Sequence, residues 1–82
     1  MNQRDRDVLR RSVQRAAIRA ARNPPPGHDL ARELTYAGYD WLDDRTGEIS
    51  DALSRGENIH VISGRIHREA FRHLLDSRKN AA

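Results

Sequence analysis

Three consecutive prolines, at residues 24–26, place the strongest constraint on how this chain folds. Proline has no backbone N–H, fixes φ near about −65°, and disfavours helical geometry in the residue before it. A helix that precedes the prolines must therefore end by Arg22 or Asn23. The prolines favour an extended, left-handed spacer of roughly 9 Å, comparable with the distance between packed helix axes. We expect residues 23–28 to form a polyproline corner that folds the chain back on itself.

Residues 3–22 form the first segment with helical periodicity. Leu9, Val13 and several alanines fall on one face, which predicts an amphipathic helix whose small side chains let a neighbouring helix come close. Arginines recur on another side at spacings of seven, four, four and three residues, which return to nearly the same angle because each residue advances by about 100°. The arginine stripe consists of Arg4, Arg11, Arg15, Arg19 and Arg22.

Two further helices are expected directly after the corner. The second helix covers about residues 29–43, with Asp29 offering a cap to its first turn. Gly38 lies on the apolar face of that helix, where it would let another backbone approach. The third helix covers about residues 47–55, between a Thr46 cap and a terminating glycine.

The stretch ENIHVISG is ambiguous, because its isoleucines and valine favour a strand and also begin a helical stripe. A lone strand would find no partner strand in this chain, and unpaired backbone groups are costly when buried. We therefore expect a fourth helix over about residues 59–78, capped by Asn58. A shorter helix capped by Ser63 stays open.

These patterns predict an all-α fold, a compact bundle of three to four short helices within one domain of residues 1–82. A chain of 82 residues lies near the lower end of what folds without metals, disulfides or a partner, so its core must be small. The large residues expected in that core are Leu9, Val13, Leu30, Leu34, Trp41, Leu42, Ile49, Leu53, Ile59, Ile62, Ile66, Phe71, Leu74 and Leu75.

Charge is divided along the chain into basic, acidic and basic thirds. Residues 1–22 carry seven arginines against two aspartates, residues 28–57 carry eight acids against three arginines, and residues 58–82 carry five bases against two acids. These thirds can pair across a compact bundle. The arginine stripes therefore also fit a solvated surface, or one paired with acids such as Asp40 and Asp43.

The segment LARELTYAGYDWLDD resembles a helix-turn-helix motif, which implies reading of DNA. It departs from that motif at Thr35, where a turn glycine is usual, and at Asp44, where an apolar residue is usual. Its would-be reading helix is acidic and would be repelled by phosphate, so an ordinary amphipathic helix is favoured. The apolar offsets that carry the resemblance are Leu30, Ala31, Leu34, Tyr36 and Trp41.

The sequence contains no pattern that predicts catalysis, a metal site or a bound cofactor. The serines lack a nucleophile-elbow context, no glycine-rich phosphate loop is present, the four histidines lack metal-ligand spacing, and there is no cysteine. The first residues lack the apolar core of a signal peptide, and no apolar run approaches the roughly 20 residues that span a bilayer. We therefore expect a cytoplasmic protein that is not an enzyme and does not enter a membrane.

The function that the sequence favours is a small protein-binding module, such as an inhibitor, adaptor or regulatory antagonist of the kind that phages and other mobile elements encode. Val8 and Ile18 lie off the apolar face of the first helix, and Tyr36 and Tyr39 lie off that of the second. Apolar side chains displaced from a core are typical of a contact patch. A homodimer is a further alternative, because small chains with thin cores often associate.

The alternative function is a small, basic nucleic-acid-binding regulatory protein. Clustered arginines neutralise phosphates and release counterions, whereas the acidic middle third would repel a nucleic-acid backbone. The candidate residues are Arg11, Arg15, Arg19 and Arg22 on the first helix and Arg65, Arg68 and Arg72 on the last.

Overall fold

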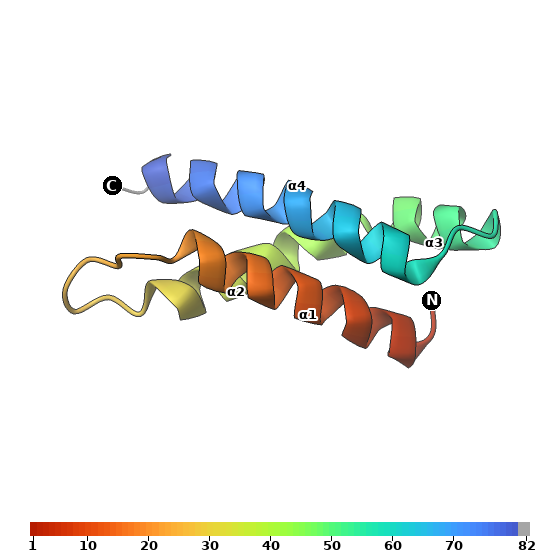
Figure 1. Cartoon of the computed structure of the whole chain (residues 1–82), viewed down its shortest axis with the longest axis horizontal. Helices are drawn as coiled ribbons and strands as arrows, with labels where there is room; N and C mark the ends of the chain where they lie inside the picture. Colours follow the sequence, from red (N-terminus) through yellow and green to blue (C-terminus); the bar gives the residue numbers. More distant parts are fainter. Residues whose placement is uncertain (81–82) are drawn as a thin grey trace.

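The computed structural model describes residues 1–80, and every regular element among them is an α-helix. This confirms the all-α fold class that the periodicity predicts. Figure 1 shows the four helices in chain order. They are α1 (Gln3–Ala20), α2 (Leu30–Asp43), α3 (Thr46–Ser54) and α4 (Ile59–Asn80).

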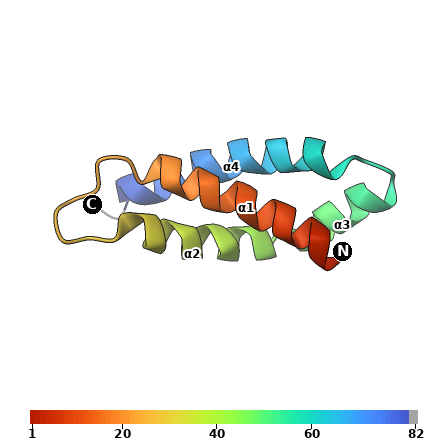
Figure 2. The same cartoon turned by 60° about the horizontal axis from the view of Figure 1, so that its bottom comes forward.

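Three helices lie side by side along the 44 Å length of the bundle, whose other dimensions are 20 and 17 Å. Helix α1 packs against both α2 and α4. Figures 1 and 2 show that α2 runs antiparallel to α1, whereas α4 runs in the same direction as α1. The short helix α3 lies at the end of the bundle where α1 begins. Helix α1 is therefore the element that the other two long helices share.

The apolar face predicted for the first helix is buried, although α1 is rich in charged residues. Leu9 is 1% exposed and Val13 is 0% exposed, and the alanines of the same face are buried with them. Because alanine is short, α2 and α4 can approach the α1 backbone closely, and the close contacts gain dispersion energy. The small buried residues of α1 are Ser12, Ala16, Ala17 and Ala20.

The remaining core comes mainly from α2, α3 and α4. Leu34, Trp41, Leu42, Ile49, Ile62, Ile66 and Leu74 are buried as expected. Five other residues of the predicted core are only half-buried and pack against the two buried clusters. These are Leu30, Leu53, Ile59, Phe71 and Leu75.

Gly38 is a point of close approach between α2 and its neighbours. A Cβ atom built on this glycine would lie 2.5 Å from Cγ1 of Val13 and 3.4 Å from Cδ1 of Leu74. The first distance is too short for real carbon atoms, and Val13 is a stiff, β-branched side chain that cannot swing away easily. The missing side chain at Gly38 therefore sets how closely α2 seats against α1.

The chain reverses between α1 and α2 through a loop at residues 21–29. Helix α1 ends at Ala20, two residues before the predicted end at 22, because Ala21 already departs from helical geometry, with φ −88° and ψ 10°. Asn23 then adopts a left-handed φ of 56°. Farther along, the His28 N–H donates to the Pro25 carbonyl at 3.2 Å, and Gly27 has φ 81°. Proline followed by a glycine of positive φ is the pattern of a type II turn. The extended, left-handed conformation expected for the prolines stays a prediction.

The other helix ends follow local capping chemistry, with one exception. The Asp29 side chain accepts from the Arg32 N–H, and the Asn58 side chain accepts from the His60 N–H, as expected for caps. The prediction that Thr46 caps α3 is wrong. Its hydroxyl donates to the Asp43 carbonyl, so α3 begins one residue early and has no side-chain cap. Helix α4 covers the ambiguous stretch and continues to residue 80, two residues beyond the prediction.

Arg78 fastens the end of α4 to the end of α1. Its guanidinium donates to the carbonyls of Ala20, at 2.9 Å, of Arg22, and of Asn23, at 2.7 Å. Carbonyls at the C-terminus of a helix have no partner within the helix and carry the negative end of its dipole. A guanidinium, with its fork of donors, satisfies several of them together. Arg78 thus caps α1 and holds the start of the proline loop.

We expect Gly38→Ala to lower the free energy of unfolding by about 1–3 kcal/mol, because overpacking against Val13 outweighs the roughly 1 kcal/mol gain in helix propensity. Urea denaturation measures the change. The matched test is the double variant with Val13→Ala, whose loss should be smaller than the sum of the two single losses. A Gly38→Ala variant more stable than the parent protein would contradict the close approach.

We expect Arg78→Ala to lower the free energy of unfolding by about 1–3 kcal/mol, because it leaves carbonyls of the α1 terminus without a charged donor. Arg78→Lys keeps the charge but loses the fork, so its loss should be intermediate. Arg72→Ala, an exposed arginine on the same helix, should change stability by less than about 0.5 kcal/mol in the same denaturation assay. Equal losses for positions 72 and 78 would rule out a specific cap.

Candidate nucleic-acid interface

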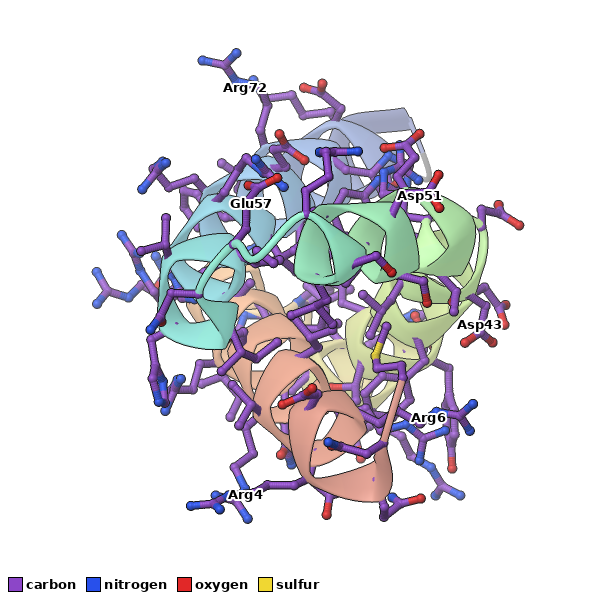
Figure 3. The ribbon with its side chains drawn as sticks, turned by 90° about the vertical axis from the view of Figure 1, so that its right-hand side faces the viewer. Arg4, Arg6, Asp43, Asp51, Glu57 and Arg72 are labelled. Carbon is purple, nitrogen blue, oxygen red and sulfur yellow. The ribbon has the colours of Figure 1, made fainter. Side chains whose placement is uncertain are left out.

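The packing of α1 beside α4 brings two sets of arginines to one flank of the bundle. The two helices meet along their length, from the buried Ser12 and Ser63 hydroxyl pair to the contact of Arg78 with the α1 terminus. In Figure 3, which looks along the bundle, Arg4 points outward from α1 and Arg72 points outward from α4. In this view Arg4 points down from α1 and Arg72 points up from α4, so the two mark opposite edges of the flank that the paired helices form.

Two open grooves follow the junction of α1 and α4. Near the start of α1, Arg4 and Arg11 line a groove together with His60 of α4 and the acids Asp5 and Asp7. Farther along, Arg19 of α1 faces α4 across a second groove, whose lining includes three basic side chains of α4 and one acid, Asp76. We call the basic side chains of these grooves the basic seam: Arg4, Arg11, Arg19, Arg68, Arg72 and Lys79.

Helical spacing explains how the basic seam arises. On α1, Arg11, Arg15 and Arg19 are four residues apart, and Arg15 and Arg22 are also exposed. On α4, Arg68 and Arg72 repeat the same step. Arg65 lies elsewhere, with its Nη1 3.7 Å from Oε1 of Glu57 in a groove on the α3 side. Four of the seven predicted nucleic-acid residues thus line the two grooves, whereas Arg15 and Arg22 are exposed outside their linings and Arg65 lies apart.

The acidic third of the chain occupies α2 and α3, away from the basic seam. Figure 3 shows Asp43 and Asp51 pointing outward on the side of α2 and α3. Within residues 1–80, the salt bridges are those of His28 with Glu33 and of Arg55 and Arg65 with Glu57. None of these joins the α1 stripe to the acids of α2 and α3. In the described part of the chain, salt bridging between a basic and an acidic third is limited to Arg65 with Glu57.

Arg19 is the most firmly held arginine of the basic seam. Its Nη1 lies 2.9 Å from Nε2 of His67, and its guanidinium carbon lies 4.5 Å from the centre of the Phe71 ring. The other ring nitrogen of His67, Nδ1, lies 3.3 Å from the Ser12 carbonyl oxygen. The guanidinium is therefore positioned from below by an aromatic face and from the side by an imidazole.

The four apolar residues predicted to contact a protein partner lie on α1 and α2 and differ in exposure. Ile18 is 56% exposed and Tyr36 is 57% exposed. Val8 is half-buried beside the groove near the start of α1. Tyr39 is half-buried against the core, with the guanidinium of Arg10 5.2 Å from its ring centre. The exposed members of this set therefore come from two different helices.

The segment that resembles a helix-turn-helix motif does not fold as one. Residues 30–43 form one continuous helix, α2, so the turn expected near Thr35 is missing. The Thr35 hydroxyl donates to the Ala31 carbonyl at 2.7 Å, within the helix. The sequence offsets match the motif only because both contain amphipathic helix.

The described residues were also searched for a metal site and for a membrane-spanning helix. Among residues 1–80, no three histidine, aspartate or glutamate side chains converge to hold a metal ion. In the same range, no helix combines the length and the apolar character needed to cross a bilayer.

Sequence reasoning missed several residues of the second groove. His67, Phe71, Leu75 and Lys79 follow one another at intervals of four residues, so they form a stripe on α4 beside the arginines. That spacing was visible in the sequence, but nothing local indicated that Arg19 of α1 would lie against it. The chain as a whole matches no protein-family profile, no curated protein and no solved structure.

Proposed function

We propose that this chain is a small, non-enzymatic nucleic-acid-binding protein that holds a phosphate backbone along the basic seam. The observation that carries the proposal is the gathering of exposed arginines from α1 and α4 along adjoining grooves. Arginine presents a planar fork of donors that suits phosphate oxygens. Such a protein would act as a regulator by occupying the nucleic acid to which it binds.

The placement of the acids supports this function over the protein-binding one. The sequence weighs against nucleic acid because its middle third is acidic. In the fold, acids such as Asp43 and Asp51 point outward from α2 and α3, whereas Arg4 and Arg72 point outward from α1 and α4 (Figure 3). A polyanion lying on α1 and α4 would therefore meet mainly positive side chains.

The physical basis of such binding is counterion release. Each phosphate neutralised on duplex DNA releases close to one condensed cation, so the logarithm of the affinity falls linearly with the logarithm of salt concentration. If all members of the basic seam contact phosphates, the slope for a duplex is about −5. The seam contains no base-reading helix, so affinity should depend little on sequence.

We expect Arg68→Gln and Arg72→Gln each to weaken duplex binding and to reduce the steepness of the salt slope by about one. Fluorescence anisotropy with a labelled duplex, measured between about 50 and 200 mM salt, gives both quantities. The matched control is Arg32→Gln on α2, an exposed arginine whose guanidinium lies 5.9 Å from the centre of the Tyr36 ring. Two results would overturn the proposal. One is a duplex affinity that does not change with salt concentration, and the other is an equal loss of affinity in the Arg32→Gln control on α2.

A protein-binding function is the second candidate, and the exposure of Ile18 and Tyr36 favours it. On this hypothesis, affinity capture from the source cell retains a protein partner after nuclease treatment. Ile18→Asp and Tyr36→Ala should then release that partner without changing stability, because both side chains are largely solvent-exposed. Capture that disappears with nuclease assigns the interaction to nucleic acid instead.

A further inference from the structure

We propose that Arg19 and His67 form a phosphate-binding subsite within the basic seam, and that this subsite takes up a proton when a phosphodiester binds. The inference rests on the proposed function, because the phosphodiester is that of a nucleic-acid backbone. The inference goes beyond that function because it names the two residues that bind one phosphate. It also makes the affinity dependent on pH.

The two contacts of the His67 ring fit one arrangement of its ring proton. A guanidinium has donors and no acceptor, so the 2.9 Å contact with Arg19 requires Nε2 of His67 to accept. A carbonyl only accepts, so the 3.3 Å contact with Ser12 requires Nδ1 to carry the proton. Both bonds exist together only in the neutral ring with its proton on Nδ1. A protonated His67 would lose the bond from Arg19 and face it with a like charge.

Arg19 is held ready to bind an anion. One Nη1 proton is directed to His67, and the Phe71 ring lies 4.5 Å from the guanidinium carbon. The other N–H groups of the fork remain for an oxygen ligand. Holding the side chain in place beforehand reduces the conformational entropy lost when a ligand binds. Arg19 is itself exposed, but it differs from the other arginines of the seam in having these two contacts before a ligand binds.

The charges around His67 favour an anion in this groove. From α1 it faces Arg19, and from its own helix it shares the groove with Arg68, Arg72, Asp76 and Lys79. Helices α2 and α3 contribute no side chain to the lining of this groove. Four cations and one carboxylate give an excess of positive charge that one phosphodiester reduces. The site is thus selective for negative ligands before any proton is added.

A bound phosphodiester changes which protonation form of His67 is favoured. Its negative charge beside Arg19 and His67 favours the protonated ring, in which Nε2–H donates to a phosphate oxygen instead of accepting from Arg19. Binding is therefore coupled to proton uptake. Because the protonated form binds more tightly, the affinity is highest at low pH and falls as pH rises through the range in which imidazole loses its proton.

The experiment measures duplex affinity at fixed salt from about pH 5.5 to about pH 8, the range in which histidine changes charge. For the unchanged protein we expect the affinity to fall by about threefold to tenfold across this range, as for the loss of one phosphate contact. His67→Gln preserves an acceptor for Arg19 and a donor for the Ser12 carbonyl but does not titrate. Because His60 also lines the seam, both proteins carry His60→Gln in this comparison. The affinity of the His67→Gln variant should then stay near the high-pH value of its parent at every pH.

A control and a spectroscopic readout separate a binding role from a structural one. His28→Gln, on the proline loop beside Glu33, should keep the pH dependence of the unchanged protein. Nitrogen NMR of the His67 ring at constant pH should report a proton on Nδ1 alone in the free protein and protons on both nitrogens after addition of duplex. A merely structural contact would leave the ring unchanged on binding.

The outcomes distinguish this inference from the function on which it rests. If duplex binding is steep in salt but His67→Gln keeps the pH dependence, the subsite is wrong and the nucleic-acid function stands. If no duplex binds at low salt, the function is wrong, and titration with inorganic phosphate still tests the subsite. If His67 takes up a proton when inorganic phosphate binds, the subsite is supported. If the protonation of the ring does not change on addition of phosphate, the subsite is overturned.

Discussion

The close approach of α2 and α4 to α1 is the constraint on which the rest of this structure depends. Helix α1 offers buried alanines instead of large side chains, and α2 meets it with Gly38 against Val13. Small residues on both sides let backbones approach until short side chains touch, which gives a dense core from few large residues. A chain of 82 residues buries a limited fraction of its surface, so such packing replaces the bulk that a larger core would supply.

The same packing determines where the basic and acidic side chains lie on the surface. Because α2 reverses the chain once and the chain reverses again through α3, α4 returns parallel to α1 (Figure 1). Parallel neighbours place their arginine stripes along one junction, and the acidic helices α2 and α3 are left on the other side. The position of Arg19 over Phe71 and beside His67 follows from the register of this pair. One interface thus serves stability and generates the grooves in which basic side chains meet.

Local chemistry predicted most of the helical framework. The bounds of α2 coincide with its pattern of apolar residues and its Asp29 cap. The errors lie at termini, where local preference competes with other contacts. Helix α1 stops before its periodicity does because the backbone leaves helical geometry at Ala21, and Arg78 donates to the freed Ala20 carbonyl. The Thr46 hydroxyl donates to the Asp43 carbonyl at the end of the preceding helix, so it does not accept from an amide of α3.

By itself the sequence determined which segments are helical, which face of each is buried and that the stripe arginines of α1, with Arg68 and Arg72 of α4, stay in water. These properties depend on spacing within one helix, and spacing is written in the chain. Only the tertiary structure decided that Arg19 meets His67, that Arg65 turns to Glu57 and that Arg78 caps a helix more than fifty residues away. Such contacts depend on the distance and register between helices, which small residues at their crossing points set and which no local pattern encodes.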